Sequence, residues 1–255
     1  ALCAAGRTHR AAPRARRFGA EMVLARDVVG FDVRGPVRCV CFSDGTEIEA
    51  RAVLVATGVS YRLLDAPGLG GLTGRGVYYG ATASEAQATE GDDVYVVGAA
   101  NSAGQAALNI ARFARRVVLL VRSESLEKSM SQYLVERIRG ADNIEVQLET
   151  QVVAGRGDDH LEAITIADRA GGTEAEAPTN WLFVFIGASP RTDFLGDDVA
   201  RVDKGFVITG QDLLPRNDGS RCPLPRAPLP LEPSGPGLCA AGDVRLAPMT
   251  RVASA

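Results

Sequence analysis

A short segment of glycine and alanine residues in the middle of the chain has the residue types and spacing that bind a phosphate group. It runs from Gly98 to Ala103, after the apolar residues 94–97 and before apolar residues at helical spacing. It matches the pattern G-x-G-x-x-A, except that Ala100 takes the place of the second glycine. In such a turn, backbone N–H groups and a helix N-terminus face a pyrophosphate. We interpret this segment as a dinucleotide-binding turn formed by Gly98, Ala99, Ala100, Asn101, Ser102 and Ala103, with an ordinary tight strand–helix turn as the alternative.

Two details of this turn affect how a nucleotide would bind. Asn101 and Ser102 are of the types that cap a helix N-terminus, and we expect them to cap this one. The methyl group of Ala100 narrows the approach to the backbone, so we expect the ligand to lie slightly farther out or to bind more weakly than it would over glycine.

The next predicted strand ends in residues that can distinguish NADP from NAD. In dinucleotide sites an acid at this strand end binds the ribose hydroxyls of NAD, whereas an arginine accommodates the 2′-phosphate of NADP. Arg122 therefore favours NADP, with Ser123 and Lys128 as further candidate contacts. A solvated turn arginine is the alternative interpretation, and the nearby Glu124 keeps NAD open.

Three further apolar segments end in small or acidic residues. The first ends at Thr57 and Gly58, the second at Ile186 and Gly187, and the third at Gly242-Asp243. Buried strands often end in glycine, so each of these is weak evidence alone. Their order around the Gly98 turn is much harder to explain by chance, and we predict that all three contact a cofactor.

The cysteines suggest neither a disulfide framework nor a metal site. There are five, at scattered positions, and this favours a reducing compartment, which we predict to be the cytoplasm. Cys39 and Cys41 would share one face of a strand. We interpret them as two small apolar side chains, with a redox or metal role as the alternative. His9 and His160 are the only histidines, so we predict no metal site.

The hydrophobic pattern predicts the elements that position these residues. Strand–helix–strand units occupy the middle of the chain, and sheet segments of a different character flank them, which predicts one α/β domain inserted into another. Ser43-Asp44-Gly45 has the composition of a hairpin turn. The predicted strands are 28–42, 47–55, 93–98, 117–121, 144–148, 161–167, 181–186, 206–209 and 238–241; the predicted helices are 11–25, 102–115 and 129–138, and a proline-rich loop covers 215–236.

Composition excludes two classes of protein. The 255 residues carry a net charge of −3, which gives no electrostatic reason to bind nucleic acid. No apolar run approaches the roughly 20 residues that a membrane-spanning helix needs.

The order of these motifs resembles the pyridine nucleotide-dependent flavoprotein reductases, and among them the thioredoxin reductases. The resemblance covers residues 18–255. It implies an α/β fold in which a Rossmann-like, three-layer ββα NAD(P)-binding domain is inserted into a partial FAD-binding domain. It also implies FAD and NADP(H) as cofactors, and a homodimer.

The resemblance assigns roles to individual residues. Thr57 and Gly58 would lie close to the flavin, and Gly98 to Ala103 would form the NADPH loop. Ile186 and Gly187 would lie beside the bound nucleotide. Asp243, after Gly242, would hydrogen-bond the ribityl chain of FAD. The backbone contacts to the flavin ring would come from Arg251, Val252 and Ala253.

The implied domain bounds are 1–83, 84–200 and 201–255. The first and last ranges would form the FAD-binding domain and the middle one the NAD(P)-binding domain. The two connections about which the nucleotide domain rotates would lie near Thr82–Glu85 and near Phe194–Lys204.

The sequence departs from this family in two ways. Gly80 and Ala83 stand where thioredoxin reductases carry Cys-x-x-Cys, so we expect a branch without thiol–disulfide exchange through that pair and predict no catalytic side chain. The family's first strand and glycine-rich loop, which hold the ADP part of FAD, have no counterpart before Gly19, and the chain stops at Ala255. We therefore expect an incomplete chain with an incomplete flavin site.

The leading hypothesis is hydride transfer from NADPH to FAD and on to an unknown acceptor, such as a quinone, oxygen, a small redox protein or a partner domain. Two alternatives remain. One is a non-catalytic nucleotide-sensing or interaction module that retains the fold. The other is a ferredoxin- or flavodoxin-type NADP reductase, which also works without the cysteine pair.

Overall fold

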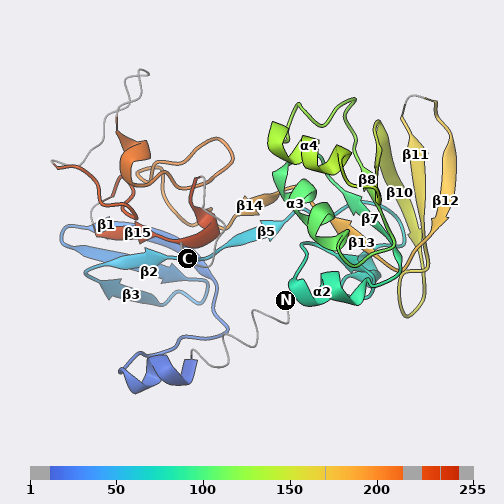
Figure 1. Cartoon of the computed structure of the whole chain (residues 1–255). Helices are drawn as coiled ribbons and strands as arrows, with labels where there is room; N and C mark the ends of the chain where they lie inside the picture. Colours follow the sequence, from blue (N-terminus) through green and yellow to red (C-terminus); the bar gives the residue numbers. More distant parts are fainter. Residues whose placement is uncertain (1–11, 170, 215–225, 236, 247–255) are drawn as a thin grey trace. The chain divides into compact units, whose positions relative to one another are not determined.

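The computed structural model describes residues 12–169, 171–214, 226–235 and 237–246 (Figure 1). The chain forms two compact units. Residues Tyr61–Gly187 form one, which we call the inserted unit, and Ala1–Ser60 together with Ala188–Ala255 form the other, the outer unit. A domain inserted into another was predicted from the sequence.

The inserted unit is built on a five-stranded sheet in which every neighbouring pair of strands is parallel. Its order explains which strand ends become neighbours, because strands distant in the sequence lie side by side. The order across the sheet is β6 (Val77–Tyr78), β13 (Leu182–Val184), β7 (Asp93–Val97), β8 (Arg116–Leu120) and β9 (Ile144–Gln147).

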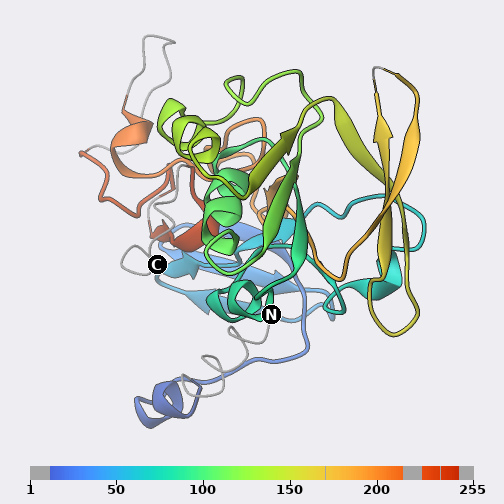
Figure 2. The same ribbon diagram turned by 45° about the vertical axis from the view of Figure 1, so that its right-hand side comes forward.

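Both faces of this sheet are covered, which makes three layers. Helices α2 (Ala83–Ala88), α3 (Asn101–Ile110) and α4 (Gln132–Arg139) lie on one side. An antiparallel sheet of β10 (Thr150–Arg156), β11 (Ala163–Asp168) and β12 (Glu174–Pro178) lies on the other (Figure 2). The α/β, Rossmann-like fold class predicted from the sequence is confirmed.

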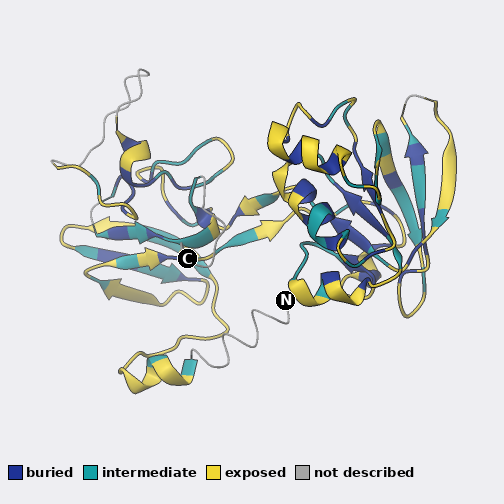
Figure 3. Cartoon of the chain, viewed as in Figure 1, coloured by how far each residue is buried: buried dark blue, intermediate teal, exposed yellow. Residues whose placement is uncertain are grey.

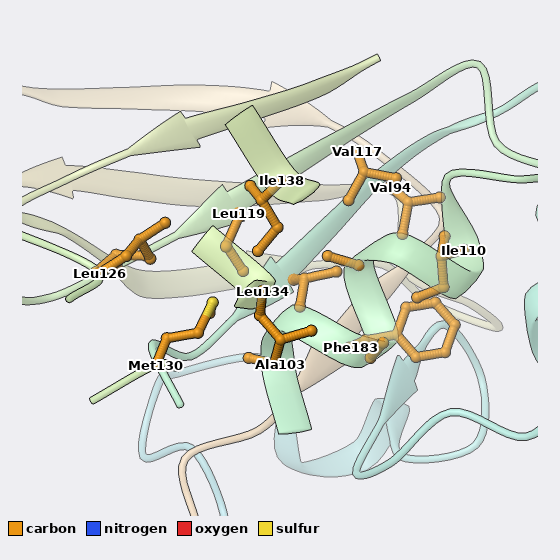
Figure 4. Packing of buried hydrophobic residues seen from close by; sticks show 14 of the residues in the cluster. Val94, Ala103, Ile110, Val117, Leu119, Leu126, Met130, Leu134, Ile138 and Phe183 are labelled. Atoms are coloured by element: carbon orange, nitrogen blue, oxygen red, sulfur yellow. The ribbon is translucent and has the colours of Figure 1, made fainter. Parts of the chain in front are cut away.

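Side chains alternate between the two faces of each central strand, so these strands contribute to an apolar cluster on each side of the sheet. In β7, Val94 and Val96 pack against the helices in one apolar cluster, whose packing Figure 4 shows. Tyr95 and Val97 point the other way, into the cluster under the antiparallel sheet. The central strands are buried on both faces (Figure 3). Such a strand has a continuous apolar sequence, so these strands could be predicted from the sequence.

The outer unit contains an antiparallel sheet and a parallel pair of strands. The antiparallel sheet consists of β1 (Val28–Arg34), β2 (Val37–Phe42) and β3 (Glu47–Ala50), and the parallel pair of β4 (Val53–Val55) and β15 (Leu238–Ala240). Its buried cluster includes Val55, Leu195, Val207 and Leu238. The short 3-10 helices are η1 (Gly70–Leu72) in the inserted unit and η2 (Gly210–Leu213) and η3 (Gly242–Val244) in the outer unit.

The chain passes between the units at two strands, β5 (Val59–Tyr61) and β14 (Ala188–Pro190), which pair in a two-stranded sheet. This differs from the connections expected near Thr82–Glu85 and Phe194–Lys204, and from the bounds 1–83, 84–200 and 201–255. Two contacts explain the difference. Strand β6 pairs with β13 and so belongs to the inserted sheet, and Leu195 is buried in the cluster of the outer unit.

Several elements differ in extent from the sequence expectation. The segment 28–42 is a hairpin rather than one strand, because Gly35 adopts a left-handed conformation (φ +62°) between β1 and β2. Within the expected helix 11–25, residues 12–17 are helical. Strands β10 and β12 and helix α2 were not predicted, and 206–209 forms only isolated bridges. Among the described residues, no helix has the length and apolar character needed to cross a membrane.

Candidate functional site

The turn after β7 can accept only glycine at its first position. Gly98 has φ +145°, and a Cβ built on it would lie 2.5 Å from the carbonyl oxygen of Phe185 and 3.0 Å from Cβ of Ala103. Ala103 is fully buried at this contact. The glycine and the alanine together let the start of α3 pack closely on the sheet, which is the role of these positions in a dinucleotide-binding turn.

Helix α3 begins without a side-chain cap. Its N-cap is Ala100, and no side chain accepts a hydrogen bond from the first turn. The expectation that Asn101 and Ser102 cap the helix is wrong, because the tight turn places both inside the helix. Ala100, Asn101 and Ser102 are exposed, so the positive end of the helix dipole faces solvent. An anion at this position would be stabilised by the dipole and by backbone N–H groups.

Two hydrogen bonds to the segment before α4 hold the turn in place. Ser129 Oγ donates a hydrogen bond to the carbonyl oxygen of Ala99 (2.8 Å), and the side-chain oxygen of Asn101 accepts one from the backbone N–H of Ser131 (2.8 Å). Sequence reasoning missed both serines. They lie 30 residues from their partners, and no local signal marks such a contact.

The parallel register brings three predicted site segments to one edge of the sheet. Val184 of β13 is the register partner of Val97 of β7, and Val97 is the partner of Leu120 of β8. The segments that follow these strands, at Ile186–Gly187, Gly98–Ala103 and Arg122, are therefore neighbours at the carboxyl edge. Ligands of open α/β sheets bind at this edge.

Arg122 is the cation best placed to meet a phosphate at this edge. Its side chain is exposed, and within the described part of the chain it forms no ion pair. Lys128, by contrast, is paired with Glu124, and this pair lowers the pKa of the Glu124 carboxyl. Ser123 donates its hydroxyl hydrogen to the carbonyl oxygen of Ser125 (2.8 Å). Of the site residues predicted after β8, Lys128 and Ser123 therefore have side-chain partners, whereas the exposed Arg122 guanidinium is available to a ligand.

The positions where the resembling family carries its cysteines lie after β6, at the same edge. Gly80 has φ +115°, and Ala83 is the first residue of α2. Thr82 and Glu85 form a capping box that fixes the start of this helix. No cysteine occurs anywhere in Tyr61–Gly187, because the five cysteines are Cys3, Cys39, Cys41, Cys222 and Cys239.

A second group of predicted site residues meets in the outer unit. Val55 of β4 is the register partner of Ala240 of β15, so the segments that follow both strands lie at one edge. These segments contain Thr57, Gly58, Gly242 and Asp243. Gly58 (φ +68°) and Gly242 (φ +73°) both have open space where a Cβ would be.

Asp243 and Thr57 are the polar side chains of this second group. Asp243 is exposed at the start of η3, and Thr57 Oγ1 donates a hydrogen bond to the carbonyl oxygen of Arg191 (2.6 Å). The predicted contacts Arg251, Val252 and Ala253 lie outside the described residues.

A cavity of about 320 Å³ lies in the inserted unit. It opens between the parallel and the antiparallel sheet, where its lining includes Tyr95, Arg116 and Asp168. None of the predicted cofactor-binding residues lines it. We therefore do not assign it to a dinucleotide.

Comparison with known proteins gives a consistent result. The family described as pyridine nucleotide-disulphide oxidoreductase matches residues 2–254. A bifunctional thioredoxin reductase/thioredoxin of Mycobacterium leprae is 35% identical over 194 residues, which cover 76% of this chain and 42% of the relative. A thioredoxin reductase of Streptomyces clavuligerus is 32% identical over 193 residues, covering 76% of this chain and 59% of the relative.

A solved structure is similar over nearly the whole chain. The thioredoxin reductase of Streptococcus pyogenes superposes with a TM-score of 0.72 at 25% sequence identity, covering 95% of this chain and 72% of the other. The chain thus spans about half the length of the two curated relatives, and 72% of the length of this structure.

Proposed function

This chain belongs to the pyridine nucleotide-disulphide oxidoreductase family. We propose that it functions as an NADPH-dependent, FAD-containing oxidoreductase. The proposed reaction is hydride transfer from NADPH to FAD, followed by electron transfer to an acceptor without a dithiol relay. The observation that carries the proposal is the Gly98 turn, with its uncapped helix and with Arg122 at the neighbouring strand end.

The residues of the inserted unit fit NADPH in three respects. The Gly98 turn allows the backbone to come close to a pyrophosphate, and the uncapped N-terminus of α3 offers N–H donors to it. Arg122 offers a guanidinium group to the 2′-phosphate, which NADH lacks. The carboxyl edge that carries these groups is where this class of sheet binds nucleotides.

The residues of the outer unit fit FAD. Gly58 and Gly242 leave the turns after β4 and β15 open, and the exposed carboxylate of Asp243 is an acceptor for a ribityl hydroxyl. FAD, when bound, supplies the hydride acceptor and the route to one- or two-electron acceptors. The chain's own contribution is to bind and orient the two nucleotides.

The absence of cysteine from Tyr61–Gly187 supports an acceptor that takes electrons from the flavin directly. In the thioredoxin reductases that the chain resembles, the segment at Gly80 and Ala83 carries the redox pair. Neither residue can form a mixed disulfide. We therefore propose that this protein does not reduce a disulfide through that segment.

The test of the proposal is the binding of NADPH and NADH to the chain by isothermal titration calorimetry. Arg122→Ala removes the proposed 2′-phosphate contact. Because hydrogen bonds to charged groups contribute about 1.5–3 kcal/mol, the variant should bind NADPH at least about tenfold more weakly than the wild type does. Binding of NADH should be almost unchanged. Arg137→Ala is the matched control, because Arg137 contacts the exposed Tyr133 on α4.

A second arm of the experiment separates an oxidoreductase from a nucleotide-binding module. The chain is mixed with FAD and NADPH without oxygen, and the flavin absorption band is followed. Bleaching of the band supports the proposed reaction, whereas binding of both nucleotides without bleaching favours the non-catalytic module. A chain that binds neither nucleotide contradicts the proposal altogether.

A further inference from the structure

Two cysteines and a glutamate meet on one face of the antiparallel sheet in the outer unit. Cys39 and Cys41 lie on β2, and Glu47 lies on β3. The Cys39 thiol donates to Oε2 of Glu47 (3.2 Å) and the Cys41 thiol to Oε1 (3.6 Å). The candidate ligand atoms of all three residues lie within 4.8 Å of one another.

The sheet register explains this arrangement. Residues two apart on a strand share a face, and directly opposite residues of neighbouring strands also share one. Cys41 is the register partner of Glu47, so all three side chains lie on the same face of the sheet. Phe31, whose register partner is Val40, lies on the other face and packs against the apolar cluster of the outer unit.

The cysteines are not used to build an apolar core. Cys39 is fully buried, but it belongs to none of the three apolar clusters found among the described residues. Its thiol is hydrogen-bonded to a carboxylate. A buried thiol in these surroundings differs from the small apolar side chain that the sequence suggested.

The spacing of the ligand atoms suits a tetrahedral ion. Typical Zn–S and Zn–O bonds of about 2.3 and 2.1 Å at a tetrahedral angle place sulfur and oxygen about 3.6 Å apart. The observed Sγ···Oε separations of 3.2 and 3.6 Å are within a few tenths of an ångström of this value.

The local charge also suits a divalent ion. Arg34 donates to both oxygens of Glu47 (2.8 and 3.1 Å), which fixes the orientation of the carboxylate. Two thiolates and the carboxylate would carry three negative charges. A divalent cation would offset two of these charges. The Arg34 guanidinium, which also pairs with Asp32 (2.9 Å), lies beside the third.

We propose that Cys39, Cys41 and Glu47 bind a divalent cation of the zinc class, with water in the fourth position. Thiolate ligands select zinc over magnesium or calcium, which prefer oxygen. Binding replaces two thiol hydrogens by the cation and releases two protons, and no electrons are transferred. The sequence alone predicted no metal site, because nothing along the chain indicates that β3 brings Glu47 to the two cysteines.

The test is a titration of the reduced chain with Co²⁺, which replaces zinc in tetrahedral sites and reports its ligands by absorption. We expect one Co²⁺ per chain, a thiolate-to-cobalt charge-transfer band, and loss of the band when Zn²⁺ is added. Cys41→Ser and Glu47→Gln should each weaken Co²⁺ binding by about a hundredfold or more, since even outer-shell changes cost 10–100-fold. Cys239→Ser is the matched control and should bind as the wild type does.

The two single variants should remain folded, so weaker Co²⁺ binding would not be caused by unfolding. Cys41 and Glu47 are not fully buried, so circular dichroism should report an intact fold for both. A chain without a thiolate band, or a Cys39→Ser/Cys41→Ser variant that retains the band, overturns the proposal. In the second case another cysteine holds the ion.

Discussion

At the scale of single residues, the strongest sequence signals were those with one physical explanation. Gly98 was identified because a tight turn needs it. The structure gives the reason, because a Cβ at this position would lie 2.5 Å from a carbonyl oxygen. Asn101 was assigned as a cap because its residue type favours caps, yet its side chain bonds to Ser131 instead. Residue type predicted the possibility of a hydrogen bond but could not identify its partner.

An ion pair with a buried carboxylate, in the proline-rich segment, gives a prediction at this scale. Glu232 accepts hydrogen bonds from both terminal nitrogens of Arg226 (2.7 and 2.9 Å) and from the Leu229 N–H (3.1 Å). These bonds lower the pKa of the Glu232 carboxyl below its ordinary value of about 4.3. The Glu232 side chain is only 6% exposed, whereas that of Arg226 is 54% exposed, so solvent reaches the pair from the arginine side alone.

Because the folded-state pKa is lowered, Glu232 stabilises the fold above its ordinary pKa, and this contribution is lost as the pH falls towards the folded value. Glu232→Gln should lower the free energy of unfolding by about 1–3 kcal/mol at pH 7. The difference from the wild type should shrink between about pH 5 and pH 3, as denaturant titrations at each pH would measure.

The control for this prediction is Glu162→Gln. Glu162 pairs with Arg156, but both side chains are exposed, so the loss at pH 7 should stay below about 1 kcal/mol. Equal losses for the two variants, or a Glu232→Gln difference that grows at low pH, would contradict the assigned role of Glu232.

At the scale of elements, the sequence predicted the central strands well and the antiparallel layer poorly. β7 and β8 are buried on both faces and read as apolar runs. β12, with the sequence Glu-Ala-Glu-Ala-Pro, is an edge strand with almost every residue exposed, so it carries no apolar signal. Tertiary structure imposes the pairing of β12 with β11, so this pairing could not be predicted from the sequence.

The N-terminus of α3 gives a prediction at this scale, because stability and nucleotide binding should respond to it with opposite signs. Ala100 is the N-cap and provides no cap hydrogen bond. Ala100→Asp should stabilise the fold by about 0.5–2 kcal/mol, because aspartate caps the helix and its charge favours the dipole. The same carboxylate would occupy the place of the pyrophosphate and repel it, so NADPH binding should be lost.

Two further variants at this position separate capping from charge. Ala100→Ser supplies a cap without charge and should stabilise the fold while weakening NADPH binding less than aspartate does. Ala100→Gly removes the methyl group and should strengthen NADPH binding, because the backbone can then approach the pyrophosphate more closely. Thermal melting and calorimetric titration of the three variants measure both effects. NADPH binding by Ala100→Asp as tight as the wild type's would mean that the pyrophosphate does not lie at this helix.

At the scale of the whole molecule, the inserted arrangement was predicted, but the positions where the chain changes unit were not. Motifs such as Gly80–Ala83 mark functions, whereas the limits of a unit depend on which strand pairs with which. β6 is two residues long and was not visible in the sequence, yet its pairing with β13 assigns the segment after Tyr61 to the inserted unit.

The separate cores predict how NADPH should act on the molecule. Each apolar cluster lies within one unit, so the two units should be stabilised separately. A ligand that binds only the native inserted unit raises its free energy of unfolding by about 2.7 kcal/mol at a concentration 100 times the dissociation constant, which corresponds to about a hundredfold slower exchange of its core amides. Hydrogen exchange with and without NADPH should therefore slow at Val96 and Leu119, whereas the amides of Val55 and Ala240 should be unaffected. Equal slowing in both units would show that they unfold together, and no slowing in either would contradict the NADPH site at the Gly98 turn.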